Sequence, residues 1–177
     1  MRFAVLMQKQ HMDNPWQNYR WLPLSIEADL GQFGGVSGNQ IRGRFLKRDD
    51  VNETWVFTGF DFQFFSDEAE GYFLNSSAPE PAWFVMWRLE PEPSPFIAED
   101  SKANAIHEEG LAIPNRIMLS YNEAARLIDG GETVDIVPLS NDLKQLLAAY
   151  VEQHYKPEPK KRQKPASFKG ASRAAEG

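Results

Sequence analysis

The stretch TWVFTGFDFQFF, residues 54–65, carries aromatic side chains at every second position, with one change of parity in the middle. Its alternating aromatic residues are Trp55, Phe57, Phe60, Phe62 and Phe64. A period of two is typical of a strand with one buried face. One extra residue at Thr58-Gly59 would keep both sets on the same face, as a β-bulge does. The stretch therefore predicts a long, bulged strand that contributes to an aromatic core.

Other segments of the chain also have the residue pattern of strands. We predict strands at residues 3–7, 22–30, 71–75, 82–89, 116–120 and 132–137. In residues 22–30 the apolar side chains alternate, with Leu24 and Leu30 among them, and Pro23 indicates either an edge position or a bulge. Residues 82–89 are apolar on both faces, which predicts a central strand covered by a helix or by a second sheet layer.

Two helices are expected in the second half of the chain. Ser120 and Glu123 have capping-box spacing ahead of an apolar segment that ends at Gly130-Gly131. Ser140 can cap a final helix at residues 141–155. The apolar face of this last helix consists of Leu143, Leu146, Leu147, Tyr150 and Val151. Strands followed by helices predict an α+β fold, a mainly antiparallel sheet or partly closed β-barrel covered by the C-terminal helix.

The distribution of charge suggests one boundary in the chain of 177 residues. Residues 156–177 hold seven basic and two acidic residues, a charge of +5, so the remainder carries −11 of the total of −6. This basic segment contains three prolines and little apolar surface, which is typical of a disordered tail. We therefore expect a single globular domain at residues 1–155 and a basic, proline-containing tail at residues 156–177.

Composition excludes several kinds of site and partner. The chain has no cysteine, so disulfides, thiolate metal sites and cysteine nucleophiles are ruled out. No apolar run reaches the roughly 20 residues of a membrane span, and the first ten residues lack a signal-peptide pattern. The acidic balance argues against a nucleic-acid partner. We expect a cytoplasmic protein.

Three further features of the sequence have plainer interpretations than a functional site. The three histidines, His11, His107 and His154, are too far apart in sequence to suggest a metal site. The glycine-rich residues 31–43 lack the Gly-Lys-Ser/Thr sequence of a phosphate loop and predict a flexible connection. The acidic residues 90–109 predict a surface excursion. We expect no catalytic residue, no metal and no cofactor.

The strongest candidate for binding is an aromatic turn near the N-terminus. It is formed by Asp13, Asn14, Trp16, Arg20 and Trp21. Tryptophan and arginine dominate binding hot spots because each covers a large area and carries a hydrogen-bond donor. The alternative is that the two tryptophans belong to the core, which is favoured for Trp21 and left open for Trp16.

A second candidate is a short acidic cluster. Glu68 and Glu70 precede Tyr72, and Asp67 lies next to them. Two carboxylates with different pKa values can divide acid and base roles. Solvated acids in a turn between strands are the plainer interpretation, and a polar or cationic ligand is the alternative. In the tail, Lys160, Lys161, Arg162 and Lys164 are candidates for electrostatic contact with an acidic partner or with the acidic body itself.

Several blocks of this sequence resemble a proteobacterial family known as domain of unknown function 3305. They are residues 13–16 with Arg20-Trp21, and residues 67–72, 81–88, 119–127, 129–132 and 154–162. The genes of that family commonly lie beside those for formate dehydrogenase and other molybdenum enzymes. Some of its members carry a label for molybdopterin-guanine dinucleotide synthesis. The present chain lacks the N-terminal glycine-rich fingerprint of such nucleotidyltransferases.

The resemblance implies an accessory role. We expect a non-catalytic protein that assists assembly or maturation of a molybdenum-dependent formate dehydrogenase, with a dehydrogenase subunit or a maturation factor as protein partner. The alternative is a small enzyme or binding protein that acts on a molybdenum-cofactor precursor or a nucleotide. It is supported by the glycine-rich loop and by the acids at residues 67–70.

Overall fold

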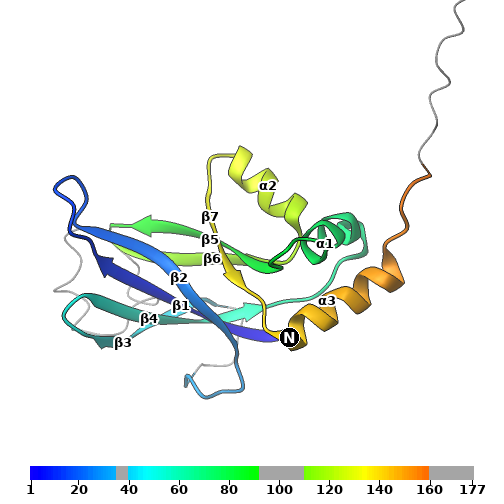
Figure 1. The fold of residues 1–177 in the computed structure, drawn as a ribbon. Coiled ribbons are helices and arrows are strands. Elements are labelled where there is room, and N and C mark those ends of the chain that lie inside the picture. Colours follow the sequence, from blue (N-terminus) through cyan, green and yellow to red (C-terminus); the bar gives the residue numbers. More distant parts are fainter. Residues whose placement is uncertain (35–39, 92–109, 160–177) are drawn as a thin grey trace, which may run out of the picture.

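The computed structural model describes residues 1–34, 40–91 and 110–159, where seven strands form two antiparallel sheets accompanied by three α-helices (Figure 1). In spatial order, the first sheet contains β2 (Tyr19–Ala28), β1 (Arg2–His11), β4 (Asn52–Asp61) and β3 (Arg42–Arg48). The second contains β6 (Leu111–Met118), β5 (Ala82–Glu90) and β7 (Thr133–Pro138). The helices are α1 (Ala69–Ser76), α2 (Tyr121–Asp129) and α3 (Asn141–His154), and a 3-10 turn at Ser66–Glu68 precedes α1.

The bulge predicted in β4 is confirmed. Phe3 of β1 pairs with Phe60, whereas Val5 pairs with Phe57, so β4 has one residue more than β1 over this interval. Gly59 makes the bulge possible, because its φ is +99° and a Cβ there would lie 2.2 Å from the carbonyl oxygen of Gln40. Both aromatic sets of β4 therefore contribute to the core, although the strand ends at Asp61.

Strand β2 is an edge strand with an irregularity next to Pro23. Leu6 pairs with Ser25 and Met7 pairs with Pro23, which leaves Leu24 as the extra residue. The extra residue reverses which side chains of β2 face the core, so Pro23 is buried while Leu24 is 43% exposed. The predicted single apolar face of residues 22–30 is thus wrong at Leu24, and also at Leu30, which is 90% exposed beyond the strand.

Strand β5 is central in the second sheet, as predicted. Trp83 and Val85 are buried in the core cluster, while Phe84 lies on the other face against Tyr121 of α2. Strand β6 begins at Leu111, well before the predicted residue 116, and it too contains an irregularity. Met86 pairs with Arg116 and Trp87 pairs with Pro114, so Asn115 is the bulged residue.

The two sheets share one core but do not form a barrel. Among the described residues no strand of one sheet pairs with a strand of the other. Of the two predicted alternatives, the antiparallel arrangement is confirmed, as two sheets, and the barrel is wrong. The sheets meet through side chains instead. The ring of Trp83 lies 4.9 Å from that of Phe3 and 5.1 Å from that of Phe62, in edge-to-face geometry.

The predicted strand at residues 71–75 is wrong, because this segment lies in α1. Its buried side chains, those of Ala69, Tyr72 and Asn75, are three apart, which is the spacing of one helix face, and Gly71 is buried beside them. Asn75 fixes the helix in place, since its side-chain amide donates to the carbonyls of Ala82 and Leu119 at 2.8 Å and accepts from the Ala82 N–H at 3.0 Å. Five residues were too few to distinguish a strand from a helix.

Helix α3 follows the expected cap and ends one residue earlier than expected. The Ser140 side chain accepts from the Leu143 N–H. Leu147 is fully buried, and the Tyr150 ring stacks on Phe64 at 4.2 Å, whereas Leu146 is exposed, contrary to the prediction. The helix lies beside α1 at one end of the molecule (Figure 1). Among the described residues no helix is long and apolar enough to cross a membrane.

Three of the predicted segments lie partly or wholly outside the described residues. They are residues 35–39 of the glycine-rich connection, nearly all of the acidic residues 90–109, and the basic tail beyond residue 159 with Lys160, Lys161, Arg162 and Lys164.

Candidate functional site

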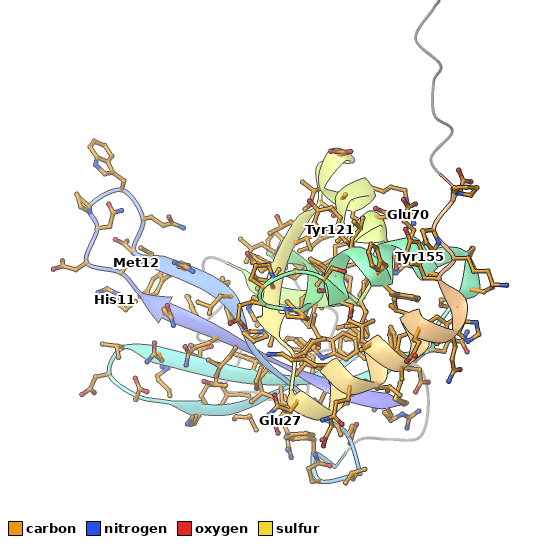
Figure 2. All side chains as sticks on the ribbon, turned by 45° about the vertical axis from the view of Figure 1, so that its right-hand side comes forward. His11, Met12, Glu27, Glu70, Tyr121 and Tyr155 are labelled. Carbon is orange, nitrogen blue, oxygen red and sulfur yellow. The ribbon has the colours of Figure 1, made fainter. Side chains whose placement is uncertain are left out.

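The first candidate region is the turn between β1 and β2, which presents Trp16 to solvent. The Trp16 side chain is 93% exposed. Its backbone is held by the Asn14 side chain, whose Oδ1 accepts the Trp16 N–H at 2.9 Å. The turn is closed by the Met12 N–H, which donates to the carbonyl of Asn18 at 2.8 Å. A large apolar side chain is therefore exposed on a turn that hydrogen bonds hold in place. Figure 2 shows the neighbouring His11 and Met12 where the β1–β2 hairpin projects from the rest of the molecule.

The two candidates of the predicted aromatic turn that lie in β2, Arg20 and Trp21, are on opposite faces of the sheet. Trp21 pairs with Lys9 and packs partly buried against the core, whereas Arg20 pairs with Gln10 and is exposed. The Lys9 ammonium lies 4.0 Å from the ring centroid of Tyr19 and 6.0 Å from that of Trp21, a cation–π arrangement. Of the candidates, Asp13, Trp16 and Arg20 are thus available on the surface, and Trp21 supports the fold.

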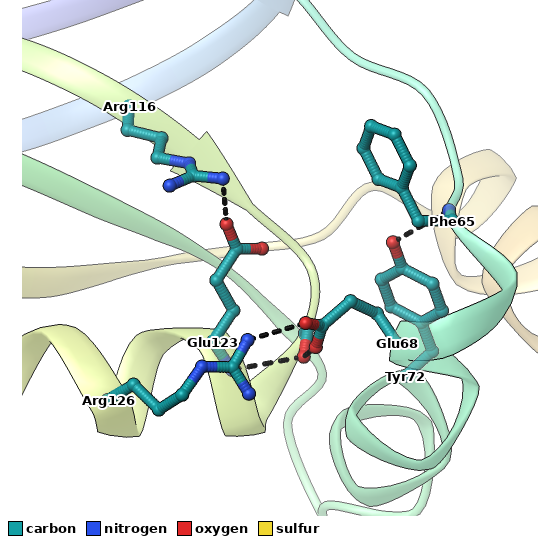
Figure 3. A network of polar contacts seen from close by, with 7 residues as sticks. Phe65, Glu68, Tyr72, Arg116, Glu123 and Arg126 are labelled. Atoms are coloured by element: carbon teal, nitrogen blue, oxygen red, sulfur yellow. Dashed lines mark hydrogen bonds and ion pairs between the residues drawn. The ribbon is translucent and has the colours of Figure 1, made fainter.

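The second candidate region is a set of ion pairs between α2, β6 and the 3-10 turn that precedes α1, which we name the arginine–glutamate cluster: Glu68, Arg116, Glu123 and Arg126 (Figure 3). Arg116 pairs with Glu123, and Arg126 pairs with Glu68. Ser120 connects the two pairs, because its Oγ donates to Glu68 Oε2 at 2.5 Å and accepts the Glu123 N–H at 3.1 Å. The cap of α2 and the cluster therefore share one hydroxyl group.

Burial changes the acidity of two groups in this region. The pKa of Glu123 is raised, chiefly by burial, while the charge of Arg116 acts in the opposite direction. Burial also raises the pKa of Tyr72 to about 12. The Tyr72 oxygen accepts the Phe65 N–H at 3.2 Å (Figure 3), and its own proton stays in place at neutral pH. The region thus combines a half-buried carboxylate with a neutral phenol.

Two hollows open beside the cluster. The larger has a volume of about 690 Å³ and is lined by residues of β4, β6, α1 and α2, including Tyr72, Asn115 and Glu123. The smaller, of about 330 Å³, is lined by all four members of the cluster. Phe65, Arg116 and Glu123 border both. Charged and aromatic groups therefore surround a space large enough for a small molecule.

The structure brings only some of the predicted acidic cluster together. Glu68 and Tyr72 both lie beside the hollows, whereas Glu70 is exposed and lines neither of them. The interpretation of these acids as solvated turn residues fails for Glu68, because Ser120 and Arg126 hold its carboxylate. The hairpin with Trp16 lies at the other end of the molecule from Glu70 (Figure 2). The predicted binding residues thus form two separate regions.

Sequence reasoning missed Arg116 and Arg126 and gave Glu123 only a capping role. The signal that was present is the spacing of Ser120 and Glu123, which correctly predicted the start of α2. In a capping box the glutamate side chain accepts a hydrogen bond from the backbone N–H of the first residue of the box. Here the Glu123 carboxylate pairs with Arg116 of β6 instead. Only the fold places that arginine within reach.

The described residues contain no group of three or more histidine, aspartate or glutamate side chains placed to hold a metal ion. His11 lies edge-to-face with Tyr19, and His154 stacks on Tyr150 in the last turn of α3.

Comparison with known proteins gives one result. No curated protein and no solved structure matches the chain. A family model described as a protein of unknown function, DUF3305, matches residues 2–164. This match contains the β1–β2 hairpin, all three helices, and every residue that lines the two hollows except Met1. The chain therefore belongs to the DUF3305 family of proteins of unknown function.

Proposed function

We propose that this protein is a non-catalytic accessory protein that binds a protein partner through the β1–β2 hairpin. The observation that carries the proposal is the 93% exposure of Trp16 on a turn fixed by Asn14. The partner we propose is a molybdenum-dependent formate dehydrogenase, through one of its subunits or a maturation factor. This choice of partner is based on the resemblance of the sequence blocks described above.

An exposed indole favours binding to a protein for a simple energetic reason. A tryptophan side chain buries at least about 150 Å² when it enters a pocket. Removing this apolar area from water favours association, although part of the gain is offset by the freedom that the partners lose on binding. Tryptophan is accordingly the residue type most enriched among binding hot spots. Because Trp16 is exposed to solvent, this favourable free energy is gained only when a partner covers the ring.

The local backbone also favours binding through this turn. The hydrogen bonds from Trp16 to Asn14 and from Met12 to Asn18 hold the turn before any partner arrives. Less conformational entropy is then lost on association. Arg20, exposed on the adjoining strand, adds a charged group able to donate several hydrogen bonds.

A deletion strain tests the physiological role. The strain should lose formate dehydrogenase activity when molybdate is plentiful, and the wild-type gene should restore it. A gene encoding Trp16→Ala should fail to restore activity, whereas Leu30→Ala should succeed. Leu30 is a matched control because it is 90% exposed on a different turn. Normal dehydrogenase activity in the deletion strain would contradict the proposal.

A second candidate function is the binding or conversion of a molybdenum-cofactor precursor or a nucleotide. The arginine–glutamate cluster beside the two hollows favours it, because charged side chains converge there on a space of small-molecule size. A screen of thermal stability with nucleotides, molybdopterin precursors and Mg²⁺ tests this function. A ligand at 100 times its Kd should stabilise the fold by about 2.7 kcal/mol. No shift with any of these compounds would eliminate it.

A further inference from the structure

The β1–β2 hairpin has a neighbour at its base, which is the turn between β3 and β4. His11 is the last residue of β1, and its N–H donates to the carbonyl of Val51 in that turn at 2.7 Å. Because β1 pairs antiparallel with both β2 and β4, the two turns lie at the same end of the first sheet (Figure 1). A partner that docks on the hairpin is therefore brought close to the second turn.

The β3–β4 turn exposes an apolar side chain on a backbone that hydrogen bonds hold in place. The Val51 side chain is 55% exposed. Asp49 Oδ1 accepts the N–H groups of Val51 at 2.9 Å and of Asn52 at 2.8 Å. The Asp49 N–H also donates to the carbonyl of Asn52. Val51 is thus presented in the same way as Trp16, whose N–H is held by Asn14.

Exposed rings lie at the base of the hairpin, next to Val51. The ring of Tyr19 is 38% exposed and meets the exposed ring of His11 edge-to-face, with the centroids 5.5 Å apart. The buried Lys9 ammonium lies 4.0 Å from the centroid of the Tyr19 ring and supports it. Rings that are already held lose little conformational freedom when a partner covers them.

The two turns are close enough for a single partner to cover both. Trp16 follows His11 by five positions, so their Cα atoms are at most about 18 Å apart even in a fully extended chain. A standard protein–protein interface buries about 800 Å² on each partner, which corresponds to a patch roughly 30 Å across. Trp16, and Val51 beside His11, therefore fit within one interface.

The charged residues of the two turns are all negative. Residues 12–18 and 49–51 contain three aspartates and no lysine or arginine. Asp49 holds its own turn, and the hydrogen bonds from the backbone lower its pKa, with the smallest contribution from the charge of Lys47. Asp13 and Asp50 are exposed, and within the described residues neither of them forms an ion pair.

The cations of the neighbouring strands are engaged or directed elsewhere. Lys9 lies against an aromatic ring, and Arg48 pairs with Glu53. Arg20 and Lys47 belong to the face of the sheet opposite Lys9, because the side chains of a strand alternate between its two faces. The two turns thus present apolar side chains together with unpaired negative charge.

We propose that the protein partner covers both turns at once, with an apolar groove for Trp16 and Val51 and with arginine or lysine side chains that face Asp13 and Asp50. Charge complementarity selects such a partner, because like charges brought together at an interface oppose binding. The inference rests on the proposed function and adds to it the chemistry of the partner's surface.

Biolayer interferometry with the full-length protein and formate dehydrogenase purified from the native host tests the apolar part of the surface. Val51→Ala should weaken binding by about 5-fold or more, because two methyl groups are withdrawn from an apolar contact. The hydrogen bonds of the turn involve only the backbone of Val51 and are kept. Leu30→Ala is the matched control, and its affinity should equal that of wild type.

The double variant Asp13→Asn/Asp50→Asn tests the charge. It should bind about 10-fold more weakly than wild type at low salt and nearly equally at high salt, since salt screens exposed charges. Asp49 is left unchanged because its carboxylate holds the turn. Glu80→Gln/Glu152→Gln removes two exposed acids elsewhere on the molecule and should retain wild-type affinity.

The outcomes separate this inference from the proposed function. If Trp16→Ala loses the dehydrogenase while either Val51→Ala or the double aspartate variant binds like wild type, this inference is overturned and the proposed function stands. Tighter binding by the aspartate variant would indicate an acidic partner surface and would also overturn it. Self-association that Val51→Ala abolishes would assign the surface to a second copy of the chain instead. Absence of binding by the wild-type protein contradicts both.

Discussion

Gly71 of α1 and Ser120 at the start of α2 are so close that no side chain fits between them. A Cβ on Gly71 would lie 2.0 Å from Ser120 Oγ. That oxygen is also fixed from two other directions, because it donates to Glu68 and accepts from the Glu123 N–H. The two helices and the arginine–glutamate cluster therefore depend on a glycine at position 71.

The substitution Gly71→Ala should destabilise the protein by about 1–3 kcal/mol, because the added methyl group forces packed atoms apart. A loss of stability would be informative, since replacing glycine by alanine within a helix ordinarily stabilises it by roughly 0.5–1 kcal/mol. Urea denaturation measures the change. The double variant Gly71→Ala/Ser120→Ala should show a favourable coupling, and stability of Gly71→Ala at or above wild type would refute the close contact.

The two tryptophans of the hairpin should respond differently to truncation. Trp21→Ala should lower the free energy of unfolding by roughly 2 kcal/mol, because Trp21 packs half-buried against the core. Trp16→Ala should change it by less than about 0.5 kcal/mol, as is usual for surface positions. Thermal and chemical denaturation of both variants provide the comparison. A large loss of stability in Trp16→Ala would place that side chain in the fold instead of at an interface.

Tyr72 should impose a pH dependence on stability at high pH. Burial raises its pKa from 10.0 to about 12, so between these pH values the unfolded chain loses the proton while the folded protein retains it. The folded state then binds more protons, and stability falls as the pH rises. Tyr72→Phe removes this contribution, so the stability of the variant relative to wild type should increase from pH 9 to pH 12. A constant difference across that range would mean that Tyr72 titrates normally.

The basic tail should be dispensable for stability. Tyr155 stacks on Phe73 at 4.4 Å, so the last ring seen to pack on α1 within the described residues lies before the tail candidates. A chain truncated after Pro159 lacks Lys160, Lys161, Arg162 and Lys164, and its melting temperature should equal that of the full-length protein. If these cations contact an acidic partner, truncation should weaken that binding at low salt and matter little at high salt. A lowered melting temperature would show that the tail belongs to the fold.

Patterns of neighbouring residues in the sequence correctly predicted those parts of the fold that depend on interactions between neighbours. The bulge at Thr58-Gly59 and the caps at Ser120 and Ser140 all follow from neighbouring residues, and the structure contains each of them. Helix α1 was missed because its buried face is set by Asn75, which is held by residues that lie up to 44 positions away. A short apolar segment carries no comparable signal of its own.

The arginine–glutamate cluster could not be predicted for the same reason. Glu68 bonds to Ser120 and Arg126, which are 52 and 58 positions further along the chain. Such pairs exist only after two helices and a strand have been packed together. For the two tryptophans of the aromatic turn, the sequence favoured the core for Trp21 and left Trp16 open, and the fold places Trp21 against the core and Trp16 at the surface.

The most direct test of the proposed function is a quantitative co-purification from the native host. Tagged wild-type protein and the Leu30→Ala control should retain formate dehydrogenase, measured by its activity and by mass spectrometry of its subunits. Tagged Trp16→Ala, folded and expressed to the same level, should retain at most about a tenth as much, because loss of a tryptophan hot spot costs 2 kcal/mol or more. Equal recovery of the dehydrogenase with Trp16→Ala, or none with the wild-type protein, would contradict the account.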